Sequence, residues 1–146
     1  MSDPTSPRAV FERLSQGISE GRWHDLADLY AEDAVVDQPF VSTAPGHLEG
    51  RETIRAHFAG AAGMGLSLVA HNVVIHETAD PEVIVAEFDY AITGDEGTAT
   101  AANIQVLRVR DGLITATRDY HDHLAIARAT GGVSALVTAI TGAPAR

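Results

Sequence analysis

The sequence predicts an α+β fold in which three N-terminal helices pack in a curved, mainly antiparallel sheet. Two observations predict it. Apolar residues recur at helical spacing through the first third of the chain, and then the pattern changes to long stretches rich in Val, Ile and Thr. Hairpin signals separate those stretches, which is typical of an antiparallel meander. Helices placed before a meander favour a sheet that wraps over them, with one concave face.

Three helices are expected before the meander. The first carries an apolar stripe that Gly21 ends: Phe11, Leu14 and Ile18. The second is short and repeats the pattern: Trp23, Leu26, Ala27 and Tyr30. The third begins at Gly50 and ends at residues 63–65, with one stripe: Ile54, His57, Phe58 and Ala61.

Strands are expected at two places. Residues 34–36 form one strand, which leads into Asp37-Gln38-Pro39 and a loop marked by Pro45 and Gly46. Four longer strands form the meander, over residues 66–75, 83–92, 98–109 and 113–124. The tail at residues 133–140 is expected to be a last helix or an extended arm.

Length and composition bound the function. The 146 residues predict one domain, residues 1–146, with residues 1–7 frayed and residues 124–146 as a C-terminal helix or arm. The net charge of −10 argues against binding nucleic acid or an anionic membrane. The chain has no cysteine, and its ten basic residues are all arginine, so thiolate and Schiff-base chemistry are excluded. A polar N-terminus without a signal peptide predicts a cytoplasmic protein.

Three stretches resemble one known family. Residues 29–39 (LYAEDAVVDQP) resemble its entry into the first strand, residues 50–58 (GRETIRAHF) resemble one of its helices, and residues 109–122 resemble its last hairpin. The chain is similar to the nuclear transport factor 2-like superfamily, in the branch of SnoaL-type polyketide cyclases, ketosteroid isomerases and limonene epoxide hydrolases. The resemblance implies a cone-like barrel with an internal pocket for a small apolar substrate, and a homodimer through the outer face of the sheet.

Departures from the family narrow the chemistry. Ketosteroid isomerases use a Tyr and two Asp residues, a system that is well described. This chain aligns Leu14, Gln38 and Gln105 with them, so steroid isomerisation by that machinery is not expected. In the epoxide hydrolase alignment, Asp122 matches a relay Asp and Asp37 matches a water-holding Asn. The Arg expected on the strand at residues 83–92 is missing.

Asp37 and Asp122 are the expected acid and base, assisted by Tyr120 or His121. A carboxylate beside an apolar wall has a raised pKa, which suits proton transfer near neutrality. Alternation on the last strand leaves two possibilities open. Either Tyr120 and Asp122 face the pocket, or His121 faces it together with its neighbours on the other face. A turn-capping role is the structural alternative for Asp37.

Seven further residues are candidates for substrate binding. Gln38, Asn103 and Gln105 carry amides that can orient a carbonyl or a hydroxyl. Aromatic and imidazole rings are expected to line the pocket or to fill the core: Trp23, Tyr30, His57 and Phe88. Asp119, His121 and His123 have a spacing that could chelate a metal on a strand, but a solvated polar face explains it equally well. No metal and no cofactor are expected.

Two functions follow from these residues. The first is a cofactor-free acid–base enzyme acting on a polyketide-like or terpenoid-like molecule by cyclisation, isomerisation, dehydration or epoxide opening. The second is a non-catalytic protein that binds a small molecule on the same scaffold. Only the first needs a carboxyl group that titrates near neutrality inside the pocket.

Overall fold

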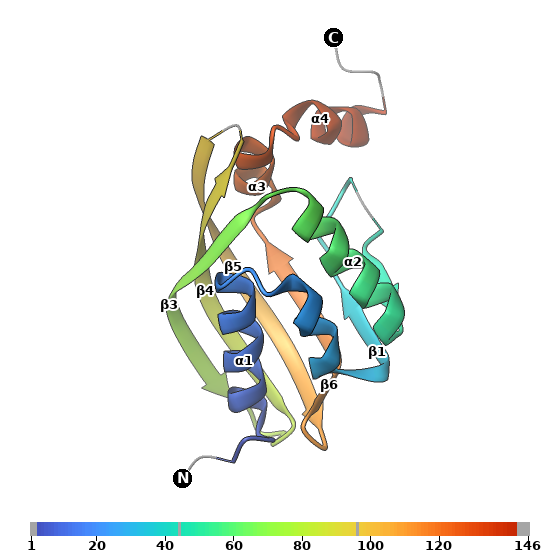
Figure 1. Cartoon of the computed structure of the whole chain (residues 1–146), viewed down its shortest axis with the longest axis vertical. Coiled ribbons are helices and arrows are strands. Elements are labelled where there is room, and N and C mark those ends of the chain that lie inside the picture. The colour runs from blue at the N-terminus through green and yellow to red at the C-terminus, as the bar shows by residue number, and fades with distance from the viewer. Residues whose placement is uncertain (1–2, 44, 96, 143–146) are drawn as a thin grey trace.

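A computed structural model describes residues 3–43, 45–95 and 97–142 of the chain. Within these ranges one mixed sheet has six strands in the order β2-β1-β6-β5-β4-β3, with β2 and β3 as its open edges (Figure 1). The elements in chain order are α1 (Pro7–Ser19), η1 (Trp23–Leu29), β1 (Tyr30–Asp37), β2 (His47–Glu49), α2 (Arg51–Gly63), β3 (Ser67–Glu77), β4 (Val83–Gly94), β5 (Gly97–Arg110), β6 (Leu113–His121), α3 (His123–Thr130) and α4 (Val133–Thr141).

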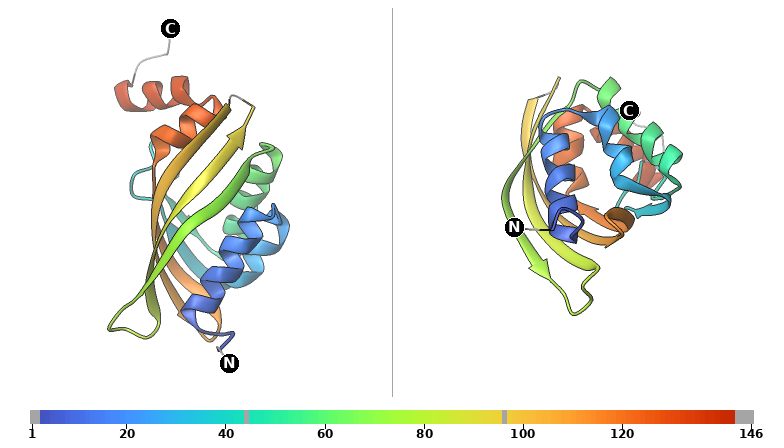
Figure 2. Two further views of the ribbon diagram at one scale, coloured as in Figure 1. Left: turned by 90° about the vertical axis from the view of Figure 1, so that its left-hand side faces the viewer. Right: turned by 60° about the horizontal axis from the view of Figure 1, so that its bottom comes forward.

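The predicted α+β class is confirmed, and the sheet curves around its helices. α1, η1 and α2 lie on the concave side, while α3 packs against β4 and β5 at one end (Figure 2). The sheet remains unclosed, so it forms part of a cone and no complete barrel. Over the described ranges, no helix has the length and apolar character needed to span a membrane.

α1 forms where the sequence predicts it. The Ser6 hydroxyl caps the helix by accepting a hydrogen bond from the Ala9 N–H at 3.2 Å, and Pro7 takes the first helical position. The helix buries Phe11 and Leu14 almost completely against the sheet. Burial of each side chain stabilises the fold by about 1.5–3 kcal/mol. Ser6 and Pro7 therefore belong to a capped helix rather than to a frayed end, and residues 1–2 lie outside the described ranges.

The second helix is a 3-10 turn that ends earlier than its apolar pattern indicates. Tyr30 has extended backbone angles and begins β1. Its ring is buried beside Phe58, with centroids 6.0 Å apart, and its carbonyl accepts a hydrogen bond from Arg51 Nε at 2.8 Å. Tertiary packing thus overrides the local helical spacing.

β1 joins the sheet in a way that periodicity does not reveal. It pairs in parallel with β6, although the two strands are far apart in sequence, and its other edge pairs with the short strand β2. β2 lies in a stretch expected to be loop. A strand of three residues carries too few alternating positions for a pattern to show.

The four strands of the meander are confirmed, with one error at the end of the last. The turn between β5 and β6 has positive φ at Asp111 and Gly112, as hairpin turns of this kind require. β6 ends at His121 rather than at residue 124. The Asp122 side chain accepts a hydrogen bond from the Ala125 N–H at 3.1 Å and caps α3, a helix that the sequence analysis had merged with the strand.

The tail then folds into α4, so a helix rather than an extended arm occupies residues 133–141, while residues 143–146 lie outside the described ranges.

Replacing Asp122 tests its structural role. Asp122→Ala removes the cap of α3 and is expected to lower the free energy of unfolding by about 1 kcal/mol. Asp122→Asn keeps a capping oxygen and is expected to change the free energy of unfolding by only a few tenths of a kcal/mol. Urea unfolding followed by circular dichroism measures both. Equal stability of Asp122→Ala and the wild type would show that Asp122 does not cap the helix.

Candidate active site

Four polar side chains meet on the inner face of β5 and β6: Asn103, Gln105, Asp119 and His121. Strand pairing sets Gln105 opposite Asp119 and Asn103 opposite His121. Alternation with the buried Ala101 and Leu107 turns the two amides toward the helices. Three of the four are buried, with 4% of Asn103, 6% of Gln105 and 8% of Asp119 exposed, so the cluster lies within the core rather than at the surface.

Asp119 is the centre of this cluster. Its Oδ1 accepts a hydrogen bond from Gln105 Nε2 at 2.8 Å. Burial raises the pKa of Asp119 to about 6, although the Gln105 hydrogen bond, the Thr117 hydroxyl and the charge of His57 each lower it. The loss of water around the carboxylate therefore outweighs its polar neighbours. Both protonation states of Asp119 are populated near neutral pH.

Thr117 adds a buried hydroxyl on the same face, two residues before Asp119 along β6. The hydroxyl is near enough to favour the charged form of Asp119. Among the described residues, no partner meets the geometry of a hydrogen bond with this hydroxyl.

His121 is held from both sides. Its Nδ1 lies 2.8 Å from Asn103 Oδ1, and its ring is 6.2 Å from the Tyr90 ring and 5.9 Å from the His123 ring. Burial, with a smaller contribution from the nearby His57, lowers the pKa of His121 to about 4. The imidazole is therefore neutral at physiological pH, a form that accepts a proton at one nitrogen.

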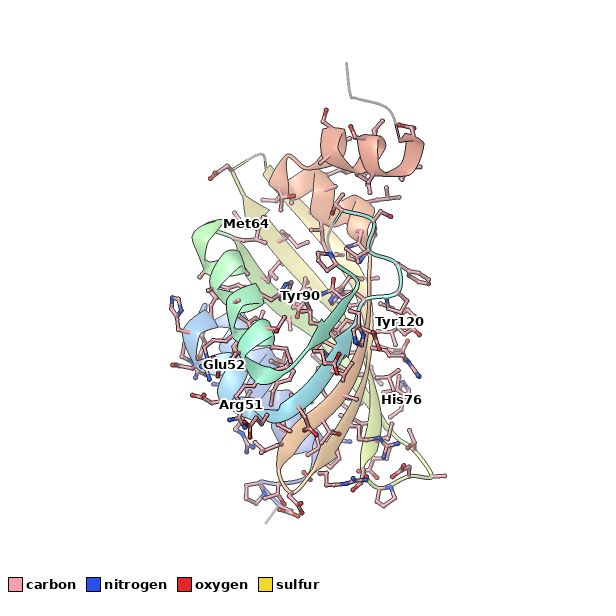
Figure 3. All side chains as sticks on the ribbon, turned by 90° about the vertical axis from the view of Figure 1, so that its right-hand side faces the viewer. Arg51, Glu52, Met64, His76, Tyr90 and Tyr120 are labelled. Carbon is pink, nitrogen blue, oxygen red and sulfur yellow. The ribbon has the colours of Figure 1, made fainter. Side chains whose placement is uncertain are left out.

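Tyr30 and Tyr90 carry phenol groups on the same side of the sheet. Burial raises the pKa of each phenol, and the negative charge of Asp119 raises it further. Both phenols therefore stay protonated and can act as hydrogen-bond donors. Figure 3 shows Tyr90 on the helix side of the sheet and Tyr120 on the opposite side. His57, on α2, is exposed at the rim of the cluster, and partial burial of its ring lowers its pKa.

Phe88 and Trp23 lie in the surrounding core. Phe88 packs between Phe11 and Tyr90, with ring centroids 5.6 Å and 5.0 Å away. Trp23 packs against Phe58 at 6.4 Å, under α2. Phe88 is on the strand next to Asn103 and borders the cluster directly. Trp23 instead contacts Phe58 of α2.

Tyr120 and Asp122 lie away from this cluster. Tyr120 points to the outer face, where its ring meets Phe40 edge-on at 5.3 Å. Asp122 is exposed and caps α3. The possibility that turned Tyr120 and Asp122 inward is therefore wrong, because β6 takes the other register and presents Asp119 and His121 to the helices.

Asp37 and Gln38 lie at the end of β1. Asp37 is exposed over 43% of its side chain, and its Oδ1 is 2.6 Å from His47 Nδ1. Its charge raises the pKa of Asp119, but this is the weakest of the effects on that group. Gln38 is half-buried and follows β1 in phase with the inward-facing Val36.

Two cavities lie near the sheet, and one of them reaches the cluster. A groove of about 490 Å³ runs over the outer face, beside Tyr120, Asp122 and Ile104, and Asn103 and His121 also line it. A second, of about 460 Å³, lies between α1 and β3. Neither is lined by Asp119 or Gln105, so the expected internal pocket is not the space that these two cavities provide.

Asp119, His121 and His123, whose spacing resembles that of metal ligands, do not lie on one strand face in the structure. His123 is the first residue of α3, and its ring meets His121 edge-on. In the residues that the structure describes, no three histidines or carboxylates gather as metal ligands.

Asp119 is not among the acids and bases expected from the sequence, where it belongs only to the metal-like spacing. The family motif favours Asp122 instead. One signal could have found it: Asp119 shares its strand face with His121, and the isomerase-like register turns that face inward. Asn103 and Gln105 on the neighbouring strand are buried and lie opposite His121 and Asp119, which shows that this register is the one formed.

A family model and a related sequence both match most of this chain. The SnoaL-like domain family matches residues 11–117. An uncharacterised PhzA/B-like protein of Pseudomonas aeruginosa is 36% identical over 131 residues, which cover 86% of this chain and 91% of that protein.

Solved structures share the fold. A Bacillus subtilis protein provisionally named an isomerase aligns with a TM-score of 0.82 at 23% identity, covering 90% of this chain and 97% of its own. A phenazine biosynthesis-related protein from Pseudomonas aeruginosa aligns with a TM-score of 0.68 at 16% identity, covering 86% of this chain and 84% of its own. An NTF2-like protein from Burkholderia xenovorans aligns with a TM-score of 0.68 at 21% identity, covering 89% and 98%.

Asp119→Asn tests the raised pKa through stability. Because the folded-state pKa of about 6 lies above the usual aspartate value of 3.8, the folded protein holds a proton that the unfolded chain releases between these two pH values. Burial of the Asp119 carboxyl group therefore does not lower the free energy of unfolding below pH 4, where the group is protonated. The destabilisation grows as the pH rises to 6 and stays constant above it. The full penalty is about 3 kcal/mol.

The asparagine variant is thus expected to be more stable than the wild type above pH 6, with the difference closing below pH 4. Urea unfolding of both proteins from pH 3.5 to 8 measures it. A difference that does not change with pH would mean that Asp119 titrates normally. Groups that do not interact with Asp119 titrate alike in both proteins and cancel in the comparison.

Proposed function

The chain belongs to the SnoaL-like family, and we propose that it is a cofactor-free enzyme that transfers protons on a small, mainly apolar molecule. One observation carries the proposal: a buried carboxyl group, Asp119, has its pKa raised to about 6. Catalytic acids and bases work best when their pKa lies near the working pH. A merely structural carboxylate is normally stabilised in its charged form instead.

Asp119 would act through its second oxygen. Gln105 holds Oδ1, which leaves Oδ2 to accept a proton from an acidic C–H or O–H of the substrate. The carboxylic acid formed in that step returns the proton to another atom, and the cycle closes without net change in the enzyme. Ring closure, double-bond isomerisation, dehydration and epoxide opening all need such a step. The protonated phenols of Tyr30 and Tyr90 are donors suited to a developing oxyanion.

The charges around Asp119 favour an uncharged substrate. No arginine is buried in the described ranges, and the chain contains no lysine. A carboxylate or phosphate bound beside Asp119 would meet a like charge and no buried cation to balance it. Aromatic neighbours such as Phe88 and Tyr90 offer apolar contact. Polyketide-like and terpenoid-like molecules fit this environment.

Access is proposed from the side of α2. His57 is exposed there, and His121 is half-buried, so a small molecule that approaches between them comes to Asp119 from the rim of the cluster. Gln38 lies at the end of β1 and can orient a substrate oxygen. Trp23, behind Phe58, stabilises α2 rather than contacting the substrate.

Turnover assays with a substrate panel test the proposal. The panel holds enones, epoxides and cyclisable polyketides, and it includes aromatic nitrogen compounds because one structural relative is named for phenazine biosynthesis. For a substrate that reacts, Asp119→Asn is expected to lower kcat by about 100-fold or more. The wild-type kcat/KM is expected to rise with pH through about 6 when Asp119 is the base.

Asp89→Asn provides the matched control, because Asp89 is an exposed carboxylate hydrogen-bonded to Asn72 on the outer face. Its kcat is expected to equal that of the wild type. Full activity of Asp119→Asn would overturn the assignment of the base. Tight binding of panel compounds with no turnover in any of them would instead favour the non-catalytic binding protein.

A homodimer through the outer face of the sheet is a second proposal. Val74 and Ile104 are 50% and 42% exposed there, a degree of exposure that a partner subunit would relieve. Ile104→Glu is expected to convert a dimer into a monomer, as measured by analytical ultracentrifugation. Val133→Glu, at an equally exposed apolar residue on α4, is the control and is expected to leave the dimer intact. A monomeric wild type would refute the proposal.

A further inference from the structure

The side-chain amide of Asn103 can adopt only one orientation. Its Nδ2 lies 2.9 Å from the carbonyl oxygen of Ala101 and 3.4 Å from that of Phe88. Both partners are acceptors, so the group that faces them must be the NH₂. Rotation of the amide by 180° would place its oxygen against two carbonyl oxygens in a buried site, which is costly.

The orientation of Asn103 determines which nitrogen of His121 carries hydrogen. With its NH₂ turned to the backbone, Asn103 presents Oδ1 to His121 Nδ1 at 2.8 Å. An oxygen of this kind only accepts, so the hydrogen of that bond belongs to Nδ1. Burial keeps the ring neutral, because it lowers the pKa of His121 to about 4. A neutral imidazole with hydrogen on Nδ1 has a lone pair on Nε2.

We propose that Asn103 is a positioning residue that holds His121 in the tautomer with hydrogen on Nδ1, so that Nε2 accepts a proton or hydrogen bond from the substrate. This inference rests on the proposed function for its use of Nε2, but the tautomer itself is a property of the free protein. It assigns a second acceptor to the inner face, two residues along β6 from Asp119.

The surroundings of Nε2 support this role. No residue in the described ranges forms a hydrogen bond with His121 Nε2, and the half-buried ring keeps it accessible. The Nε2 of the neighbouring His123 is likewise unpaired among those residues but is buried, so only that of His121 can meet a ligand.

Asp119 and His121 together define what the substrate must offer. Near neutral pH the ionised carboxylate and the Nε2 lone pair are both acceptors. A substrate that fills both must therefore present two donors, such as an acidic C–H together with a hydroxyl or an amine. A molecule whose only polar groups are ketone oxygens would satisfy the phenols but leave His121 unpaired.

Nitrogen NMR of histidine-labelled protein tests the tautomer directly. Long-range proton–nitrogen correlations distinguish a ring nitrogen that bears hydrogen from one that carries a lone pair, and His121→Gln identifies the signal. In the wild type between pH 6 and 8, His121 is expected to show hydrogen on Nδ1 alone. Hydrogen on Nε2, or a mixture of tautomers, would overturn the proposal without any variant of Asn103.

Variants at Asn103 separate positioning from general packing. Asn103→Leu removes the acceptor, and the signal is expected to shift toward hydrogen on Nε2, the form that free histidine prefers. Gln105→Leu, at the neighbouring amide on the same face, is the matched control and is expected to leave the His121 tautomer unchanged.

Persistence of the wild-type tautomer in a folded Asn103→Leu would show that Asn103 does not set it. Because the spectra need no substrate, this result is independent of whether Asp119 catalyses proton transfer. Conversely, loss of the Asp119 assignment in turnover assays would leave the tautomer assignment of His121 unaffected.

Discussion

The hydrogen bond between Gln105 and Asp119 is the interaction on which the proposed site depends. It joins the only buried carboxylate found in the described ranges to the neighbouring strand, at 2.8 Å. Burial makes the charged form of Asp119 costly, and a single neutral donor does not offset that cost. Above pH 6 the charged carboxylate lowers the stability of the fold, but the same burial lets the carboxyl group exchange a proton near neutral pH. Strain of this kind in a core is typical of functional sites rather than of structural ones.

The register of β6 places Asp119, rather than another residue of the hairpin motif at residues 109–122, in the buried position opposite Gln105. A shift by one residue would turn Tyr120 and Asp122 inward and expose the present cluster to solvent. Two features hold the register. The bulge between β5 and β6 brings Ile114 and Thr117 onto one face. The Asp122 cap ends the strand and begins α3, which packs against β4 and β5. Asp122 thus contributes to the site by positioning the strand, although it is no part of the cluster.

Local pattern predicted much of the fold, and its errors share a cause. Capping, helical spacing and hairpin turns are local, so α1, α2 and the meander could be read from the sequence. The parallel pairing of β1 with β6 and the extended conformation of Tyr30 depend on tertiary contacts that no local window contains. In the site, Asn103, Gln105 and His121 were recognised as polar residues on strand faces. Alternation showed that Asp119 shares a face with His121, but alternation alone does not say which face is inward. Burial of the partner strand decides it, and burial is a property of the folded chain.

Carbon NMR of the Asp119 side-chain carboxyl tests the central claim most directly. Protein labelled with ¹³C at aspartate is titrated from pH 3 to 9, and Asp119→Asn identifies the signal. The account predicts a titration midpoint near pH 6, well above the usual aspartate pKa of 3.8. A midpoint at or below that value would mean that the carboxylate is stabilised in its charged form. It would contradict both the electrostatic description of the inner face and the acid–base function built on it.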